Sequence, residues 1–287
     1  MKKTFLLGGV LIIAGFVNNV CGKDNELNQV INLWPDQPKI TLEVFLPSSE
    51  INTGTGIVVC PGGGYQKLCK TYEGYDLAEW LNSLGVAAFI LSYHIAPEPN
   101  TALYPWPMKD GRKAVSMVRS KAAEYGIRPN QIGIMGFSAG GHLASTIGTH
   151  WRKPDADDVV NGASCRPDFM VLLYPVISLK KPYCHLGSRE NLIGKDANDS
   201  RVAEFSNELQ VDSNTPPTFL VGASNDTTVP IENSMMFYSA LRKAGVVAEM
   251  HIFSRGKHGM GMGFRTGESC DWRPACIEWM KDLKLIK

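Results

Sequence analysis

The sequence lacks a strong charge imbalance, an apolar run long enough to cross a bilayer, and any repeat or low-complexity linker. Its 287 residues carry 29 Lys and Arg against 28 Asp and Glu, a formal net charge of +1 at pH 7. Such a balance argues against a nucleic acid or another polyanion as partner. Neither a G-x-G-x-x-G pattern nor a P-loop lysine is present, so a phosphate cradle is not expected. A catalytic or binding globule is the expectation, since 44% of the residues are hydrophobic.

The N-terminal segment has the pattern of a signal peptide. Two lysines precede an apolar run from Phe5 to Val17, which is about the length of a signal-peptide core and too short for a membrane span. Residues 1–22 are therefore predicted to be removed on export, and the mature protein to be periplasmic or secreted. A lipoprotein anchored through Cys21 is the alternative, disfavoured because two asparagines precede that cysteine where its signal requires an aliphatic and a small residue.

Six cysteines remain in the mature chain, and in an exported protein an even number permits disulfides. Cys270 with Cys276, and Cys60 with Cys69, are close enough in sequence to pair. Buried free thiols are the alternative, which is favoured for Cys60 because it lies within an apolar strand.

Alternating strand and helix patterns over residues 23–287 predict one α/β domain with a doubly wound, mostly parallel sheet and helices on both faces. One helical pattern recurs from Gly111 to Tyr125 at four-three spacing, and another runs from Pro230 to Gly245. From Gly56 onward the strands are nearly continuous apolar runs, as in a parallel sheet covered on both faces. The predicted strands are Thr41–Leu46, Gly56–Cys60, Val86–Tyr93, Gln131–Met135, Phe169–Tyr174, Thr218–Gly222 and Val247–Phe253.

Residues 136–140 read G-F-S-A-G and lie between a predicted strand and a helix of small residues. The G-x-S-x-G spacing is typical of a nucleophile elbow, in which Ser138 sits on a sharp turn that leaves no room for side chains at the flanking glycines. The helix that follows supplies backbone N–H groups and the positive end of a dipole beside the serine. Ser138 is therefore the predicted nucleophile.

A serine nucleophile needs a base, and the base needs an acid, which follow in this fold in the order Ser, Asp or Glu, His. His258 is the predicted base because its glycine-rich loop comes directly after the last strand. Asp226 is the predicted acid, since it is the carboxylate after the preceding strand; a helix cap is its alternative role. Glu232 is the weaker candidate for the acid. No catalytic role is expected for the other downstream histidines, which are His142, His150, His185 and His251.

Three glycines in P-G-G-G-Y follow an early strand and let backbone amides approach a ligand closely. The pattern matches the HGGG-type oxyanion loop of esterases, with Pro61 where histidine is usual. The predicted oxyanion donors are the amides of Gly63 or Gly64 together with that of Ala139.

The segments PGGGY, YPWPMKDGRKAV, GFSAGGHLAS, NDTTVPIENS and GKHGMGM together resemble the α/β-hydrolase carbohydrate esterases. The resemblance is to the acetyl xylan esterase-like group, which includes feruloyl-esterase-like (BD-FAE) proteins, and it spans about residues 40–280. It implies a serine esterase without cofactor or metal, with Ser138, Asp226 and His258 as the triad. Removal of acetyl groups from xylan or xylo-oligosaccharides is the implied reaction.

Substrate contacts are less defined by the sequence. Met260 is a candidate wall of a small acyl pocket, while Tyr65 and Trp106 are candidate faces for a sugar ring, with core or surface packing as the alternative. No long apolar lid segment is visible, which disfavours a long-chain lipase. Two other functions stay open: a prolyl-oligopeptidase-like serine peptidase, and a non-catalytic glycan-binding protein on a hydrolase scaffold.

Overall fold

The computed structural model describes residues 28–265, 267 and 269–287. The predicted signal peptide at residues 1–22, and with it Cys21, lies outside these residues. Within the described residues, no helix is both long and apolar enough to span a membrane.

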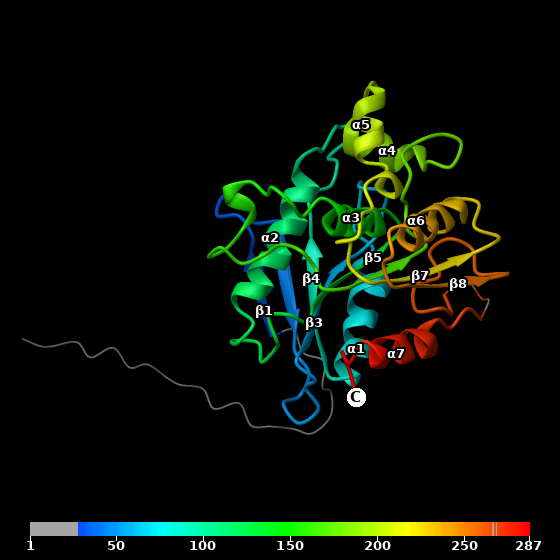
Figure 1. The fold of residues 1–287 in the computed structure, drawn as a ribbon. Helices are drawn as coiled ribbons and strands as arrows, with labels where there is room; N and C mark the ends of the chain where they lie inside the picture. The colour runs from blue at the N-terminus through cyan, green and yellow to red at the C-terminus, as the bar shows by residue number, and fades with distance from the viewer. Residues whose placement is uncertain (1–27, 266, 268) are drawn as a thin grey trace, which may run out of the picture.

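Eight strands form one sheet in the order β1-β2-β4-β3-β5-β6-β7-β8. The first two pairings, β1 with β2 and β2 with β4, are antiparallel, and all the others are parallel. The carboxyl ends of β3 and β5 to β8 therefore meet at the same edge of the sheet, and the loops that follow them gather there (Figure 1). The strands are β1 (Gln29–Asn32), β2 (Thr41–Phe45), β3 (Thr55–Cys60), β4 (Val86–Ser92), β5 (Ile132–Phe137), β6 (Met170–Leu173), β7 (Thr218–Ala223) and β8 (Ala248–Phe253).

Helices cover both faces of this sheet, with a hydrophobic cluster under each. Helices α2, α3 and α6 pack on one face, where Val115, Leu143 and Phe237 belong to one cluster. Helices α1 and α7 pack on the other, where Leu77 and Trp279 belong to a second. Helices α4 and α5 lie beyond the carboxyl edge (Figure 1). The helices and short helical turns are η1 (Thr71–Tyr75), α1 (Asp76–Ser83), α2 (Trp106–Ser120), α3 (Ser138–Thr149), η2 (Ala156–Asp158), α4 (Leu186–Ile193), α5 (Asp199–Glu204), η3 (Asn207–Leu209), α6 (Glu232–Lys243) and α7 (Arg273–Asp282).

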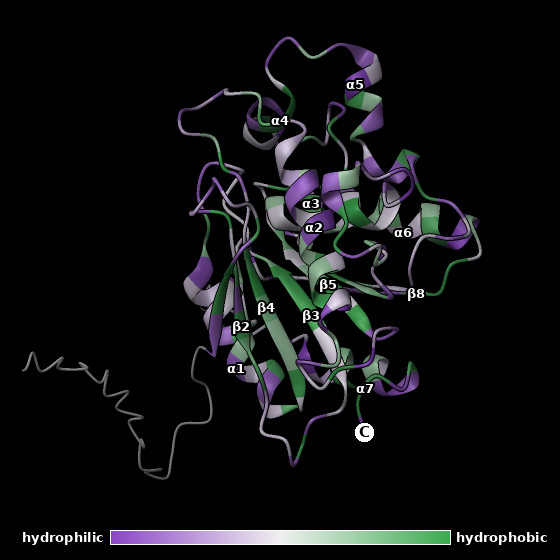
Figure 2. Cartoon of the chain, turned by 90° about the vertical axis from the view of Figure 1, so that its left-hand side faces the viewer, coloured by the Kyte–Doolittle hydropathy of each residue, from purple (hydrophilic) through white to green (hydrophobic). Residues whose placement is uncertain are grey.

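The central strands are hydrophobic along their whole length because neighbours and helices cover them on every side. All residues of β3, β4 and β5 are buried, and Figure 2 shows hydrophobic colour on these strands while α5 is largely hydrophilic. Val58 in the middle of β3 pairs with Phe89 of β4 and Ile134 of β5. This is the pattern of a parallel sheet covered on both faces, as the sequence predicted.

Neither of the suggested disulfides forms. Cys60 and Cys276 are buried free thiols, and burial raises the pKa of each thiol above its ordinary value. The pairs Cys60–Cys69 and Cys270–Cys276 are thereby excluded in this structure, and the alternative of a buried thiol at Cys60 is the correct one. Cys60 and Cys69 are close in the sequence but do not form a disulfide, because strand β3 directs the Cys60 side chain into the core.

Candidate active site

Ser138 stands at the junction of β5 and α3 in a left-handed backbone conformation, with φ of +52°. A bulky residue rarely adopts this conformation, which marks a turn that the surroundings enforce. The two flanking glycines have no room for a side chain: a Cβ on Gly136 would lie 2.2 Å from the Gly140 carbonyl oxygen, and one on Gly140 would lie 2.0 Å from that of Cys60. The expected nucleophile elbow is thus present in the backbone geometry.

The structure brings the predicted nucleophile, base and acid together at the carboxyl edge of the sheet. The Ser138 Oγ lies 2.8 Å from His258 Nε2, and His258 Nδ1 lies 2.7 Å from Asp226 Oδ2. A carboxylate only accepts hydrogen bonds, so Nδ1 carries the imidazole proton and Nε2 is left to accept from the serine hydroxyl. This chain of bonds is the one that activates a serine for attack.

The two oxygens of Asp226 have different partners, and neither caps α6, whose N-cap residue is Ile231. Oδ2 faces His258, while Oδ1 accepts hydrogen bonds of 2.9 Å from the backbone amides of Thr228 and Val229. These amides hold the buried carboxylate in place. Glu232, the weaker candidate, lies in the first turn of α6, and its carboxylate is not the one that contacts the imidazole.

The predicted oxyanion loop, residues 61–65, lies against the predicted nucleophile. A Cβ on Gly62 would lie 3.0 Å from the Ser138 Cβ, so this backbone runs directly against the serine. The Gly62 carbonyl accepts from the amide of Cys69, and the Gly63 carbonyl accepts from those of Gln66 and Lys67. In a trans peptide the N–H points opposite to the carbonyl, so the Gly63 and Gly64 amides point away from that turn. Both glycines have positive φ, +134° and +67°, as this path requires.

Ala139 is the second residue of α3, so its amide belongs to the first helical turn, whose N–H groups have no partner within the helix. The loop amides of Gly63 and Gly64 and the helix amide of Ala139 thus come from two segments that both adjoin Ser138. This placement suits the role of oxyanion donors that the sequence suggested for them.

Two of the three predicted substrate contacts are buried in the interior. Tyr65 is 1% exposed, and its hydroxyl is 2.8 Å from His142 Nδ1 beneath the loop. Met260 is 0% exposed and belongs to the cluster between the sheet and α1 and α7. We correct these two expectations, because a side chain without accessible surface offers no face to a sugar or an acyl group. Both residues are close in the sequence to predicted catalytic groups, which is why they were expected to contact the substrate.

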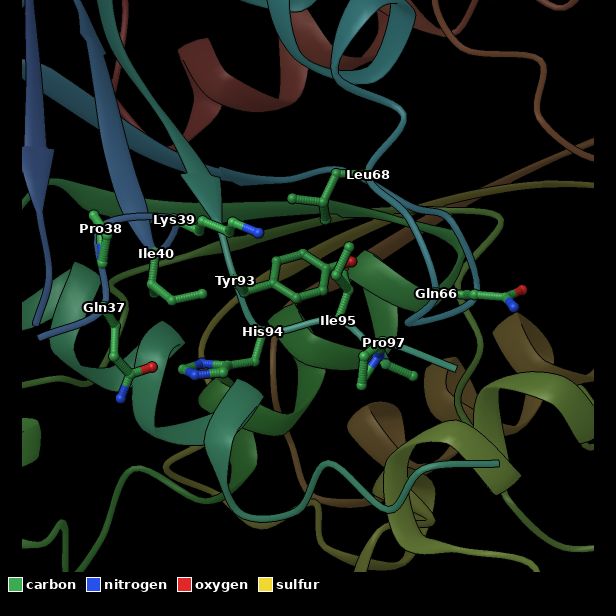
Figure 3. Close-up of a pocket in the computed structure, with 11 residues that line it drawn as sticks. Gln37, Pro38, Lys39, Ile40, Gln66, Leu68, Tyr93, His94, Ile95 and Pro97 are labelled. Carbon is green, nitrogen blue, oxygen red and sulfur yellow. The ribbon is translucent and has the colours of Figure 1, made fainter. Parts of the chain in front are cut away.

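Trp106, the third candidate, is 39% exposed at the start of α2. Its ring lies 5.1 Å from the ring of His94 and packs edge-on against Trp34. His94 lines a groove of about 650 Å³ that also includes Gln66 and Leu68, directly after the oxyanion loop. Figure 3 shows Tyr93 and His94 in the middle of this groove, with Gln37 at one end and Gln66 at the other.

Two further residues lie at the site although the sequence gave no reason to choose them. Glu73, on the π-helical turn η1, accepts a hydrogen bond from the Gly62 amide. His185 caps α4, where its Nδ1 accepts from Ser188, and its Cε1 would lie 3.9 Å from a Cβ on Gly64. Burial, and after it the charge of His258, lowers the pKa of His185 below its ordinary value. Neither residue belongs to a local motif, so only the folded arrangement identifies them.

No cluster of three or more His, Cys, Asp or Glu side chains arranged to hold a metal ion occurs in the part of the chain that the structure describes. The groups that meet at the sheet edge are a nucleophile, a base, an acid and backbone amides.

A doubly wound sheet with a serine elbow and a histidine and an aspartate on later loops defines the α/β-hydrolase class. Within that class the chain belongs to the BD-FAE family, whose model matches residues 42–241.

Two curated relatives have activities in their names. The chain is 34% identical to an acetylxylan esterase of Xylanibacter ruminicola over 267 residues, which are 92% of this chain and 51% of that protein. It is 36% identical to endo-1,4-beta-xylanase B of Butyrivibrio fibrisolvens over 209 residues, 71% of this chain and 32% of that protein. The chain thus spans about half and about a third of these relatives.

Solved structures show the same fold over nearly their whole length. An acetyl ester-xyloside bifunctional hydrolase from Caldicellulosiruptor lactoaceticus matches with a TM-score of 0.81 and 38% identity, covering 91% of this chain and 98% of that one. The carboxylesterase Cest-2923 of Lactobacillus plantarum matches with a TM-score of 0.76 at 19% identity, covering 92% and 99%. At that identity the second match shows the fold alone.

Proposed function

We propose that this protein is a serine esterase that removes acetyl groups from xylan or xylo-oligosaccharides, with residues 23–287 as one catalytic domain. The observation that carries the esterase proposal is the continuous hydrogen-bonded chain from Ser138 through His258 to Asp226, closed by distances of 2.8 and 2.7 Å. The similarity to the acetylxylan esterase and to the acetyl ester-xyloside hydrolase supports the acetylated sugar as substrate.

The mechanism follows from the placement of these groups. His258 Nε2 takes the proton of the Ser138 hydroxyl as its oxygen attacks the ester carbonyl, and the resulting imidazolium is stabilised by Asp226. His258 then gives that proton to the departing sugar oxygen, which leaves an acetyl-enzyme. A water molecule, deprotonated by the same imidazole, attacks the acetyl carbonyl and releases acetate together with the free serine.

The tetrahedral intermediate carries a negative oxygen that needs preorganised donors. In this proposal the amides of Gly63 or Gly64 and of Ala139 supply them, each worth on the order of 3 kcal/mol in the transition state. Pro61, in the place of the usual histidine, does not remove these donors because they belong to the backbone.

The sugar part of the substrate is proposed to lie against Trp106 and the groove that begins at Gln66 and His94. An exposed indole and polar side chains beside an apolar surface suit a pyranose, which has apolar ring faces and polar edges. The proximity of Gln66 to the oxyanion loop in the sequence supports a sugar that extends from the acetyl site into this groove.

The decisive experiment is an acyl-chain series of p-nitrophenyl esters from acetate to octanoate, run beside acetylated xylan and an aminoacyl anilide. The expected result is a preference for acetate, release of acetate from xylan, and no action on the anilide. A Ser138→Ala variant must lose at least 10³-fold in kcat, the order of loss known when a triad member is removed.

Each other outcome overturns a defined part of the proposal. Preference for octanoate would refute the acetyl ester, while cleavage of the anilide alone would indicate a peptidase. Glycan affinity without turnover, unchanged in Ser138→Ala, would indicate a binding protein.

Export to the periplasm or the medium is also proposed, on the lysines and apolar run of residues 1–22. Fractionation of cells that express the full chain checks it. Mature protein that begins near Lys23 outside the cytoplasm supports export, and a lipid-modified N-terminus at Cys21 would support the lipoprotein instead.

A further inference from the structure

A buried carboxylate that the proposed mechanism does not use lies between the oxyanion loop and the loop of the base. Glu73 is 2% exposed, and its Oε2 accepts a hydrogen bond of 2.7 Å from the Gly62 amide. Its Oε1 accepts one of 2.8 Å from the hydroxyl of Tyr174, which follows β6. Leaving a charge-bearing group in the interior is costly unless it is hydrogen-bonded, so this placement requires an explanation.

The network continues to the base loop, residues 256–261. The Tyr174 hydroxyl accepts a hydrogen bond of 3.0 Å from the Gly261 amide, three residues after His258. The Tyr174 ring packs edge-on against the His258 imidazole with centroids 5.1 Å apart. One hydroxyl therefore joins the carboxylate to the base loop, while its ring touches the base itself.

At the other end of the network, the contact fixes a single peptide group beside the nucleophile. The Gly62 N–H points to Glu73, and the carbonyl of the same peptide, that of Pro61, accepts from the Tyr93 hydroxyl at 2.5 Å. The orientation of this peptide determines where the chain goes next, and the next two residues are Gly63 and Gly64. A rotation of the peptide would turn the proposed oxyanion donors away from Ser138.

We propose that Glu73 is a positioning residue: its carboxylate fixes the oxyanion loop through Gly62 and, through the Tyr174 hydroxyl, the base loop that carries His258. Strands β3 and β8 are far apart in the sheet order. The Glu73 side chain thereby holds the loops that follow them at a fixed separation. The inference rests on the proposed esterase activity and adds to it a residue outside the triad.

The electrostatics of the site agree with this geometry. Burial raises the pKa of Glu73, while the hydrogen bonds from Tyr174 and Gly62 and then the charge of His258 lower it. Burial has the larger effect, so the pKa of Glu73 lies above its ordinary value despite these contacts.

The test compares Glu73→Leu, Glu73→Gln and Tyr174→Phe with each other and with the double variant Glu73→Leu/Tyr174→Phe. Thr55→Val is the matched control, because the buried Thr55 hydroxyl donates to the Leu285 carbonyl at 2.5 Å near the opposite end of β3. For each variant, kcat and KM on p-nitrophenyl acetate, the inhibition constant of a phenylboronic acid and the midpoint of thermal unfolding are measured.

Glu73→Leu is expected to lower kcat about 100-fold, the order of loss for a missing oxyanion donor, with KM changed less than about threefold. Phenylboronic acid, which forms a tetrahedral adduct with the serine, should bind more weakly by a factor similar to the loss in kcat/KM. Glu73→Gln keeps an acceptor for Gly62 and should lose no more than about tenfold. The double variant should be no slower than Glu73→Leu, because both changes break one network.

Thr55→Val should lower the unfolding midpoint while kcat stays within about twofold, as loss of one buried hydrogen bond affects stability alone. Glu73→Leu with an unchanged kcat, or with a loss confined to KM, would overturn the inference. So would losses of Glu73→Leu and Tyr174→Phe that multiply in the double variant. If Glu73→Leu does not fold, an unchanged kcat in Tyr174→Phe is the refuting result. Lack of turnover in the unmodified protein would instead refute the esterase proposal itself.

Discussion

Replacement of Gly140 by alanine tests how tightly the elbow is packed. An added Cβ would lie 2.0 Å from the Cys60 carbonyl oxygen and 2.5 Å from that of Pro61. Cβ atoms in protein structures lie about 3.4 Å or farther from such neighbours, so the start of helix α3 and the Cys60–Pro61 segment must separate by more than 1 Å. Both obstacles are backbone atoms, and no side chain can rotate to make room.

The magnitude follows from two opposing effects. Overpacking of this kind costs typically 1–3 kcal/mol, and more where backbone must move. Alanine in place of glycine within a helix raises the free energy of unfolding by roughly 0.5–1 kcal/mol. The net expectation for Gly140→Ala is a loss of about 2 kcal/mol in the free energy of unfolding. Because the displaced segment leads into the oxyanion loop, a shift of about 1 Å should also lower kcat about 100-fold.

Gly187→Ala is the matched control for this experiment. The same substitution in helix α4 would place its Cβ 3.6 Å from His185 Cε1, an ordinary contact. It should therefore raise the free energy of unfolding by roughly 0.5–1 kcal/mol. Urea unfolding and turnover of p-nitrophenyl acetate measure both variants. A Gly140→Ala protein as stable and as active as the unmodified one would refute the packing argument.

Further variants test the acid, the sugar contact and a buried base. Asp226→Asn keeps the acceptor for Thr228, but its NH2 group would donate to His258 Nδ1 and impose the wrong tautomer on the imidazole, so kcat should fall on the order of 10⁴-fold in a stopped assay. Trp106→Ala should raise KM for acetylated xylan about tenfold more than for p-nitrophenyl acetate, as loss of one stacking face implies; equal changes would refute the contact. Burial lowers the pKa of His142 from 6.5 to about 4, so the unfolded chain binds a proton that the folded one does not. Stability should fall by about 3 kcal/mol as pH drops from 6.5 to 4, and urea titrations of His142→Gln should lack this slope.

The residues proposed as catalytic could be located from the sequence because each belongs to a local pattern in a known chain order. Ser138 has the two glycines that a sharp turn needs. Asp226 follows β7, whose apolar run is typical of a buried strand, and His258 follows β8, a parallel strand at the edge of the sheet that is only partly buried. Parallel strands end at one edge of a sheet, so residues just after them must converge. The loops after these strands converge whatever the order of the strands in the sheet.

The elements that were not predicted have weak or one-sided patterns. Strand β1 (Gln29–Asn32) is an exposed edge strand with one partly covered residue, so it has no apolar run. Helix α4 carries its apolar residues mainly at one end, and it is held by His185 at its start. The sequence gives no period for either of them, because contacts from elsewhere in the chain stabilise both.

The substrate contacts were mispredicted for a different physical reason. Tyr65 directly follows the three glycines and Met260 lies two residues after His258, so both were expected to face the substrate. A loop residue beside a catalytic group can equally be the one that anchors the loop, and here the anchors are buried: Tyr65 through His142, and Met260 in the cluster under α7. The position of a residue in the chain determines which loop it belongs to. The direction of its side chain depends on the groups that pack against the loop.

Glu73 could not be identified from the sequence, although its carboxylate bonds both the Gly62 amide and the Tyr174 hydroxyl. It lies in T-Y-E-G-Y, a segment without apolar period or catalytic motif, on a single π-helical turn. Such turns point a side chain in a direction that regular helix would not, and they are frequent at functional sites. The preorganisation of an oxyanion loop depends on whatever fixes its peptide planes, and those groups need no motif of their own.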